Sequence, residues 1–214
     1  GSSWRESRTE NCDLVLLSGG WSPVVNLLSH RGVKPRWDAE NACFLPDDTT
    51  EPVIVAGSAA GIWRTGDCVV SGESAGLRAA RALDRAAAEP SAPKPGGWLA
   101  PIRPLYEVRT PNRKLKSFVD LQHDVSADDV RLAHREGYVS VEHLKRYTTL
   151  GMANDGGKMG NVIGLALMAE ALGKDIPEVG TTTFRPPYTP ISIGALSGRS
   201  VGAHFRPLRR TSLH

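Results

Sequence analysis

The chain has 214 residues, of which 40% are apolar and 23% are charged, and it carries a formal net charge of +3. This composition fits one ordinary globular domain or two small ones, and it excludes a disordered or collagen-like chain. No apolar run approaches the roughly 20 residues that a membrane-spanning helix needs, and the polar N-terminal residues predict no secretory signal.

The positive charge is concentrated at the C-terminal end. Five of the 26 basic residues follow Glu178, after which no acidic residue occurs, so the preceding body carries 21 basic and 23 acidic residues. A nucleic-acid surface would interleave basic with aromatic side chains, but only 6% of the residues are aromatic. We therefore expect a basic tail on a near-neutral body, and no nucleic-acid partner.

The first unit is predicted to alternate strands and helices. The continuous apolar run Asp13–Leu17 is typical of a strand buried on both faces, and Gly19 and Gly20 end it. Ser22 followed by Pro23 predicts the start of a short helix that ends at Gly32.

A second buried strand is predicted at Val53–Val55, running into the glycine-rich segment Ala56–Gly61. The following helix is predicted over Gly66–Ala87. Small residues on it would allow close approach to a neighbouring sheet: Gly72, Ala75, Gly76 and Ala79.

The segment Ala86–Pro104 contains five prolines and the pair Gly96–Gly97, and it is predicted to be an extended linker. It divides the chain into an α/β unit over 1–85, a mainly helical unit over 105–195 and a basic tail over 196–214.

Capping signals define the helices of the second unit. Ser126 and Asp129 form a capping box, flanked by Val125 and Val130 as a hydrophobic staple, and this helix is predicted to end at Gly137. Ser140 is predicted to cap a second helix that ends before Gly151. The third, Met159–Leu172, is apolar on most faces and is predicted to be the core helix, closed by Gly173.

The spacing Gly57-x-x-x-Gly61 between a strand and a helix allows backbone amides to approach a pyrophosphate, although a plain tight turn is the alternative. The order of elements resembles the C-terminal end of flavoproteins with two dinucleotide-binding domains, of the thioredoxin-reductase type. That family usually has Asp where Ser58 stands, and the Asp contacts the ribitol of FAD. The resemblance therefore implies NAD rather than FAD, bound by Gly57, Ser58, Ala59, Gly61, Trp63 and Thr65.

Three segments of the second unit carry a more specific resemblance. They are FVDLQHDVSADDV (118–130), EGYVSVEHLKRYTTLGMANDGGK (136–158) and VGTTTFRPPYTPISIGAL (179–196). They closely resemble the middle of the alpha subunit of heterotetrameric sarcosine oxidases. The final HFRPLRRTSLH (204–214) is similar to the lead-in to that subunit's folate-binding domain, so the chain is expected to be an internal fragment.

The helical block is also similar to the [2Fe–2S] module of related amine and opine dehydrogenase subunits. In that module, cysteine pairs would fall at Asp120 and Gln122 and within Asn154–Lys158, where this chain has none. Carboxylates and amides cannot replace thiolates on iron, so the scaffold is predicted to persist without its cluster. Neither the cysteines nor the histidines have a spacing that predicts a metal site: Cys12, Cys43, Cys68, His123, His134, His143 and His204.

The loop Gly151–Lys158 opens the predicted core helix and combines glycines with a lysine, which favours an anion site. It is not a Walker A loop, because Met159 stands where Ser or Thr would coordinate Mg²⁺. In the family, an FMN attached to the beta subunit lies between the alpha and beta subunits. The resemblance implies FMN-facing or partner-facing roles for Lys145, Arg146, Thr148, Lys158 and the segment 181–185, which includes Thr182 and Arg185. Solvated surface charges and loop packing are the alternative.

The resemblance implies a cytoplasmic complex with beta, gamma and delta subunits that oxidises sarcosine to glycine. It would use FAD on the beta subunit, FMN, O₂ and tetrahydrofolate, with NAD on the alpha subunit. This chain holds no complete catalytic constellation. The alternatives are a subunit of a related opine, proline or cyanide-forming amine dehydrogenase, or a purely structural fragment. The first unit is expected to expose apolar faces and to be poorly stable in isolation.

Overall fold

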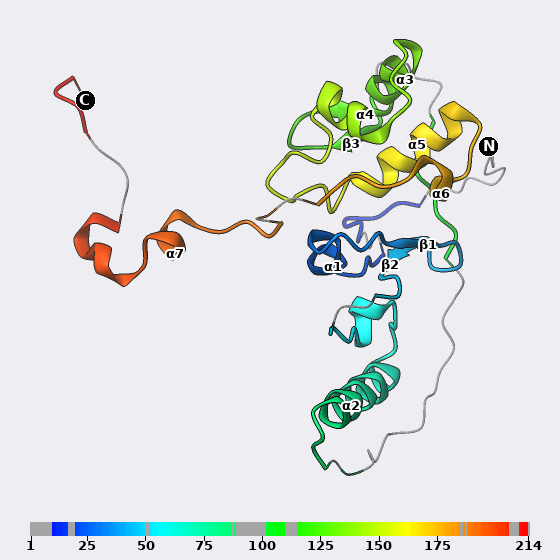
Figure 1. The fold of residues 1–214 in the computed structure, drawn as a ribbon. Coiled ribbons are helices and arrows are strands. Elements are labelled where there is room, and N and C mark those ends of the chain that lie inside the picture. The colour runs from blue at the N-terminus through cyan, green and yellow to red at the C-terminus, as the bar shows by residue number, and fades with distance from the viewer. Residues whose placement is uncertain are drawn as a thin grey trace.

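The structure is a computed structural model that describes residues 10–16, 20–49, 52–86, 88, 102–109, 115–184, 186, 188–205 and 210–213. It mixes helices with two short antiparallel hairpins. Figure 1 shows a helical body, a separate α2 and a C-terminal segment that extends away from both. Among the described helices, none has the length and apolar character needed to cross a bilayer.

The first unit is organised around a small hairpin. Helix α1 (Asn26–His30) precedes strands β1 (Arg36–Asp38) and β2 (Cys43–Leu45), which pair antiparallel. Asp38 stabilises the connection, because its carboxylate accepts hydrogen bonds from Glu40 N at 3.0 Å and Asn41 Nδ2 at 2.9 Å. These bonds, with that from the Asn41 side chain as the largest cause, lower the pKa of Asp38.

The 3₁₀ helix η1 (Gly57–Ala60) and helix α2 (Thr65–Ala82) follow. None of the residues of α2 is buried, and a Cβ added at Gly72 or Gly76 would meet nothing within 4 Å. The predicted helix is therefore present, but the close approach to a neighbouring sheet is not found among the described residues.

Two predicted strands were wrong. Residues 13–16 are not in a strand and expose Leu14, Val15 and Leu16 by 73%, 66% and 85%, while Leu17 lies outside the described residues. Residues 53–55 are also without strand pairing. An apolar run becomes a buried strand only when other strands pair with it, and no described segment does so here.

The predicted cap of the first helix was also wrong. The helix begins three residues later than Pro23, with Val25 at its N-cap and no side-chain capping bond. Val25 and Leu28 are buried, so packing of the apolar residues decides where this short helix forms.

The helical unit contains the main core. Strands β3 (Phe118–Asp120) and β4 (Val125–Ser126) lead into α3 (Ala127–Arg135), α4 (Val141–Thr148), α5 (Asn161–Leu172) and α6 (Ile176–Val179). Leu144, Met168 and Val130 are its largest fully buried side chains. Phe44 of β2 packs against this cluster, which joins the hairpin of the first unit to the helical body.

The predicted start of α3 and the predicted end of α5 were confirmed, whereas α4 ends at Thr148, before Gly151, and α5 begins at Asn161 rather than at Met159. Ser126 Oγ accepts from Asp129 N at 3.4 Å, and Asp129 Oδ2 accepts from Ser126 N at 2.8 Å, which is the reciprocal capping box. Gly173 closes α5 in the left-handed conformation, with φ = 64°. Ser140 occupies the N-cap of α4 but makes no side-chain capping bond.

Residues 102–109 span the end of the predicted linker and the start of the predicted helical unit, and they lie along the helical body. Glu107 accepts hydrogen bonds from Arg131 of α3 and from Arg109 Nε, and Arg109 also pairs with Glu170 of α5 at 2.5 Å. Most of the predicted linker lies outside the described residues. Helix α7 (Ile193–Ser197) and the 3₁₀ segment η2 (Arg199–Phe205) form the C-terminal part, which lies far from the body in Figure 1.

Candidate functional site

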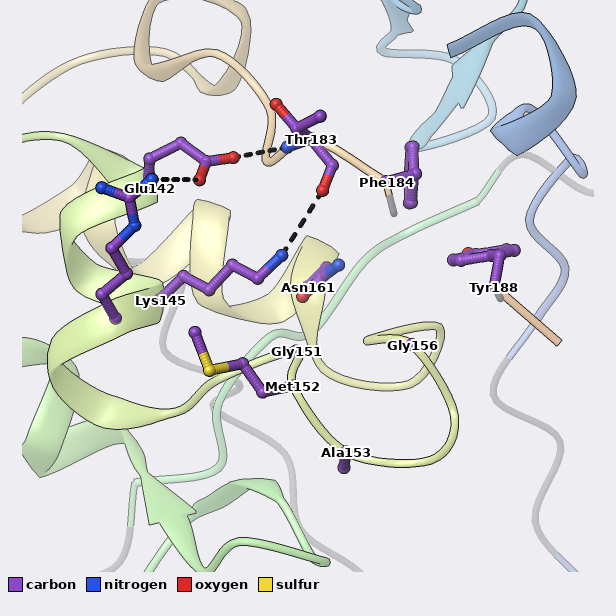
Figure 2. Close-up of a pocket in the computed structure, with 11 residues that line it drawn as sticks. Glu142, Lys145, Gly151, Met152, Ala153, Gly156, Asn161, Thr183, Phe184 and Tyr188 are labelled. Atoms are coloured by element: carbon purple, nitrogen blue, oxygen red, sulfur yellow. Dashed lines mark hydrogen bonds and ion pairs between the residues drawn. The ribbon is translucent and has the colours of Figure 1, made fainter. Parts of the chain in front are cut away.

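A pocket of about 540 Å³ opens between α4, the loop before α5 and the segment that follows α6. Figure 2 shows Glu142, Lys145 and Thr183 directed toward one another, with Phe184 and Tyr188 on the side away from α4. The pocket is lined by Glu142, Lys145, Arg146, Gly151, Met152, Ala153, Gly156, Asn161, Thr183, Phe184 and Tyr188.

Glycines allow the loop to wrap closely around the start of α5. Gly151 and Gly157 have φ of 74° and 80°, and a Cβ at either would lie 2.2 Å from the carboxamide of Asn161. A Cβ at Gly156 would lie 2.9 Å from the ring of Tyr188. Both the left-handed conformation and the lack of space require glycine at these positions.

Asn161, the first residue of α5, is a polar residue of the pocket lining. Its Nδ2 donates to Thr182 Oγ1 at 3.3 Å, while its Oδ1 is buried without a hydrogen-bond partner in the structure. A buried acceptor without a donor is destabilising, and a donor supplied by a ligand or by water would satisfy it.

Charged side chains of α4 form one wall. Glu142 Oε1 accepts from Thr183 N at 2.5 Å, and Lys145 Nζ donates to Thr183 O at 3.4 Å. Arg146 lies 4.0 Å from the other carboxylate oxygen of Glu142. These are long contacts for the two cations, so both retain capacity to bind an anion.

The opposite wall is aromatic. The rings of Phe184 and Tyr188 meet edge to face with centroids 4.9 Å apart, and Lys158 Nζ lies 4.5 Å from the centre of the Tyr188 ring. Burial, followed by the charge of Asp155, raises the pKa of the Tyr188 phenol, which therefore stays neutral. The pocket thus combines cationic side chains with aromatic faces, an arrangement suited to a planar ligand that carries negative charge.

The structure gathers most of the residues assigned to FMN or a partner subunit. Lys145 and Arg146 line the pocket, Lys158 contacts Tyr188, and Thr182 holds Asn161. Thr148 does not contribute, because its hydroxyl donates to Leu144 O within α4 at 2.7 Å. Arg185 lies outside the described residues.

Sequence reasoning did not single out three pocket residues: Glu142, Asn161 and Tyr188. Thr183 and Phe184 lie within the candidate segment 181–185, and both line the pocket. The signal available for Asn161 is its position at the first turn of the core helix, four residues after a glycine pair. Glu142 looks like an ordinary surface residue of an amphipathic helix, and only the fold brings Thr183 to it.

The predicted dinucleotide-binding residues are brought together around η1. Gly57 N donates to Ser71 Oγ of α2 at 3.2 Å, and Thr65 is the first residue of α2. Gly61 has φ of 79°, and a Cβ there would lie 2.4 Å from Leu45 Cδ2, so this glycine is also required for packing against β2. Ser58 is exposed and Ala59 half-buried, while the indole Nε1 of Trp63 is buried without a partner.

The two segments that would hold an iron–sulfur cluster in related modules do lie side by side. Gln122 Oε1 accepts from Asn154 N at 3.2 Å, and Asp120 Oδ1 accepts from Gln122 N at 2.8 Å. Within the described ranges, no group of three or more His, Cys, Asp or Glu residues could hold a metal ion.

The three cysteines are unpaired and differ in exposure. Cys12 is exposed, Cys68 is half-buried and Cys43 is buried. Burial, followed by the charge of Asp38, raises the pKa of the Cys43 thiol to about 11. Cys43 is therefore a protonated core residue rather than a reactive thiol.

Comparison with known proteins assigns the family. A family model described as the sarcosine oxidase A3 domain matches residues 114–199. Sarcosine oxidase subunit alpha of Rhizobium meliloti (strain 1021) is 45% identical over 216 residues, covering 97% of this chain and 21% of that protein. The chain belongs to the family of sarcosine oxidase alpha subunits. The resemblance that the three sequence segments predict is thereby confirmed.

A second alpha subunit, from Corynebacterium sp. (strain P-1), is 38% identical over 215 residues, covering 98% of this chain and 22% of that protein. The chain spans about a fifth of the length of these curated relatives. A crystal structure of L-proline dehydrogenase from P. horikoshii aligns with a TM-score of 0.58 and 21% identity, covering 82% of this chain and 37% of that chain. At this identity the likeness shows the fold alone.

Proposed function

We propose that the chain is part of the alpha subunit of a sarcosine oxidase complex, in which it binds nucleotide and forms a flavin-facing or partner-facing surface. The observation that carries this proposal is the 45% identity to a sarcosine oxidase subunit alpha across 97% of the chain. The whole complex would demethylate sarcosine to glycine with O₂ and tetrahydrofolate, using FAD on its beta subunit.

The pocket fits the proposed FMN-facing role. Lys145, Arg146 and Lys158 would hold the negatively charged part of the flavin nucleotide, and the rings of Phe184 and Tyr188 would contact its planar part. The flavin would supply the electron-accepting chemistry. The residues of this chain would orient it and exclude water, since no described cluster forms a complete catalytic site.

The η1 region fits a proposed NAD-binding role. The buried Nε1 of Trp63 and the buried Oδ1 of Asp67 both lack partners, as expected where a polar ligand group completes the hydrogen bonding. Trp63 lies between the glycine-rich turn and α2, and Asp67 lies in the first turn of α2. We propose a role in binding for this turn, not in hydride chemistry.

The subunit is proposed to act with beta, gamma and delta subunits in the cytoplasm. The finer fold proposed is the end of a dinucleotide-binding domain followed by a helical module that has lost its cluster. The bond between Gln122 and Asn154 supports the latter, because it joins directly the two segments that a cluster would join.

Mass spectrometry of nucleotides tests the proposal on the full-length alpha subunit, purified alone and with its partners. Acid extraction and proteolysis together release both free and chain-attached nucleotides. We expect NAD from the lone subunit and FMN only from the assembly. FAD from the lone subunit would overturn the argument from Ser58, and absence of any nucleotide from both preparations would favour a purely structural role.

Two variants locate the flavin-facing surface. Lys145→Met removes a cation from the pocket and is expected to lower the FMN content of the assembled complex while leaving NAD unchanged. Lys174→Met is the matched control, because Lys174 follows α5 outside the pocket. Equal FMN content in both variants would show that the pocket does not face the flavin.

A further inference from the structure

The segment Thr181–Phe184, here called the wall segment, contributes Thr183 and Phe184 to the pocket lining and is attached to the body through side chains. It makes no backbone-to-backbone hydrogen bond with other described residues. Its hydrogen bonds go instead to side chains of Glu142, Lys145 and Asn161. All three of these side chains also line the pocket.

The charged side chains of α4 beside the wall segment are arranged so that an anionic ligand competes with Thr183 O for Lys145. The backbone oxygen of Thr183 and the carboxylate of Glu142 are both acceptors, and the cations beside them are Lys145 and Arg146. An anion entering here must approach these same cations, and it repels both acceptors. Its charge-assisted bond to Lys145 would be shorter and stronger than the 3.4 Å contact to Thr183 O.

We infer that the wall segment responds to an anionic ligand. An anionic group such as a phosphate monoester binds Lys145 and breaks the hydrogen bond from Lys145 Nζ to Thr183 O. The attachment of the wall segment to α4 is thereby weakened. This inference rests on the proposed function only in requiring that the pocket bind an anion. It adds a regulatory consequence, because the wall segment would be ordered when the pocket is empty and released when an anion binds.

The segment is suited to such a change. Thr183 is exposed and Phe184 half-buried, and the buried Thr182 is held through Asn161, whose Oδ1 remains without a partner. Segments with few buried contacts and few backbone hydrogen bonds open at low cost in free energy. The core of the helical body, in contrast, does not include the side chains of Glu142, Lys145 or Asn161 that hold the wall segment.

Hydrogen–deuterium exchange on the lone full-length alpha subunit tests this inference, with inorganic phosphate as the probe and chloride at matched ionic strength as the reference. Peptides that cover 181–184 are expected to exchange about 2- to 10-fold faster in phosphate, the factor that corresponds to the net strength of one hydrogen bond. Peptides from α5 are expected to be unchanged.

In the Lys145→Met variant, the wall segment is expected to exchange faster than in the unsubstituted subunit even without phosphate, and phosphate should not change this rate further. In the Lys174→Met variant, the wall segment is expected to exchange as it does in the unsubstituted subunit, with and without phosphate. Slower or unchanged exchange in phosphate would overturn the inference, as would a Lys145→Met variant that exchanges as slowly as the unmodified subunit. Nucleotide content, measured separately, tests the proposed function, so the failure of either one is recognised independently.

Discussion

The helical unit and the first unit bury their apolar residues to very different degrees. The helical unit has a continuous core in which Leu144 and Met168 are almost fully buried. In the first unit, α2 has 18 residues and none is buried, and Leu14, Val15 and Leu16 are exposed. The comparison shows that the helical unit contains its own core, while apolar burial among the described residues of the first unit is confined to α1 with its N-cap and the β1–β2 hairpin and leaves α2 and Leu14–Leu16 outside it.

Because of this difference, truncation of an apolar side chain should affect the free energy of unfolding differently in the two units. In the helical unit, removal of a buried side chain leaves a cavity enclosed by α3, α4 and α5. On α2, side chains such as Val69 are already exposed, by 44% in this case, so their truncation should change the free energy of unfolding only slightly. Substitutions in the two units should therefore differ in size and, at glycines, in sign.

The largest effect is expected from Leu144→Ala. Leu144 is 1% exposed, and its truncation should lower the free energy of unfolding by about 2–5 kcal/mol. Val69→Ala on α2 is the control and should cost well under half as much. Urea unfolding of the chain, followed by circular dichroism, measures both. Equal losses would show that α2 is packed in solution.

The next effect is expected from glycines placed differently in the two units. A Cβ at Gly160, before α5, would lie 2.6 Å from the backbone oxygen of Val119, so Gly160→Ala should destabilise by about 1–3 kcal/mol. A Cβ at Gly76 in α2 would meet nothing within 4 Å, so Gly76→Ala should stabilise by about 0.5–1 kcal/mol through helix propensity. Thermal unfolding measures both, and a loss of stability in Gly76→Ala would contradict the open placement of α2.

The same contrast explains which parts of the fold the sequence predicts. Ser126 with Asp129, and Gly173, specify helix ends through contacts a few residues apart, so these signals are complete within one segment. The run Asp13–Leu17 predicts a strand only if other strands flank it, and the prediction was wrong because none of the described residues does so. Local signals therefore succeeded at the start of α3 and the end of α5, where a packed core supports them, whereas the local signal Ser22–Pro23 failed before α1.

The pocket shows the same division. Lys145 and Arg146 could be singled out only through the family resemblance, whereas Lys158 also stands in the glycine-rich loop Gly151–Lys158, which by itself favours an anion site. Glu142 and Asn161 contribute through contacts with residues 41 and 21 positions away, which only the packing of the segment after α6 creates. Thr148 was assigned through the same resemblance, but its hydroxyl donates a hydrogen bond within its own helix.

The smallest effect is expected from loss of a helix cap, and it tests whether the capping box contributes to the start of α3. Ser126 makes a reciprocal capping box, whereas Ser140 occupies the same position before α4 without a side-chain capping bond. Ser126→Ala should therefore cost about 1 kcal/mol, since Asp129 N loses its acceptor, while Ser140→Ala should cost clearly less. Urea midpoints of the two variants measured side by side give the difference. If both serines prove equivalent, then the capping box does not add to the packing of Val125 and Val130, and tertiary burial alone determines the start of α3.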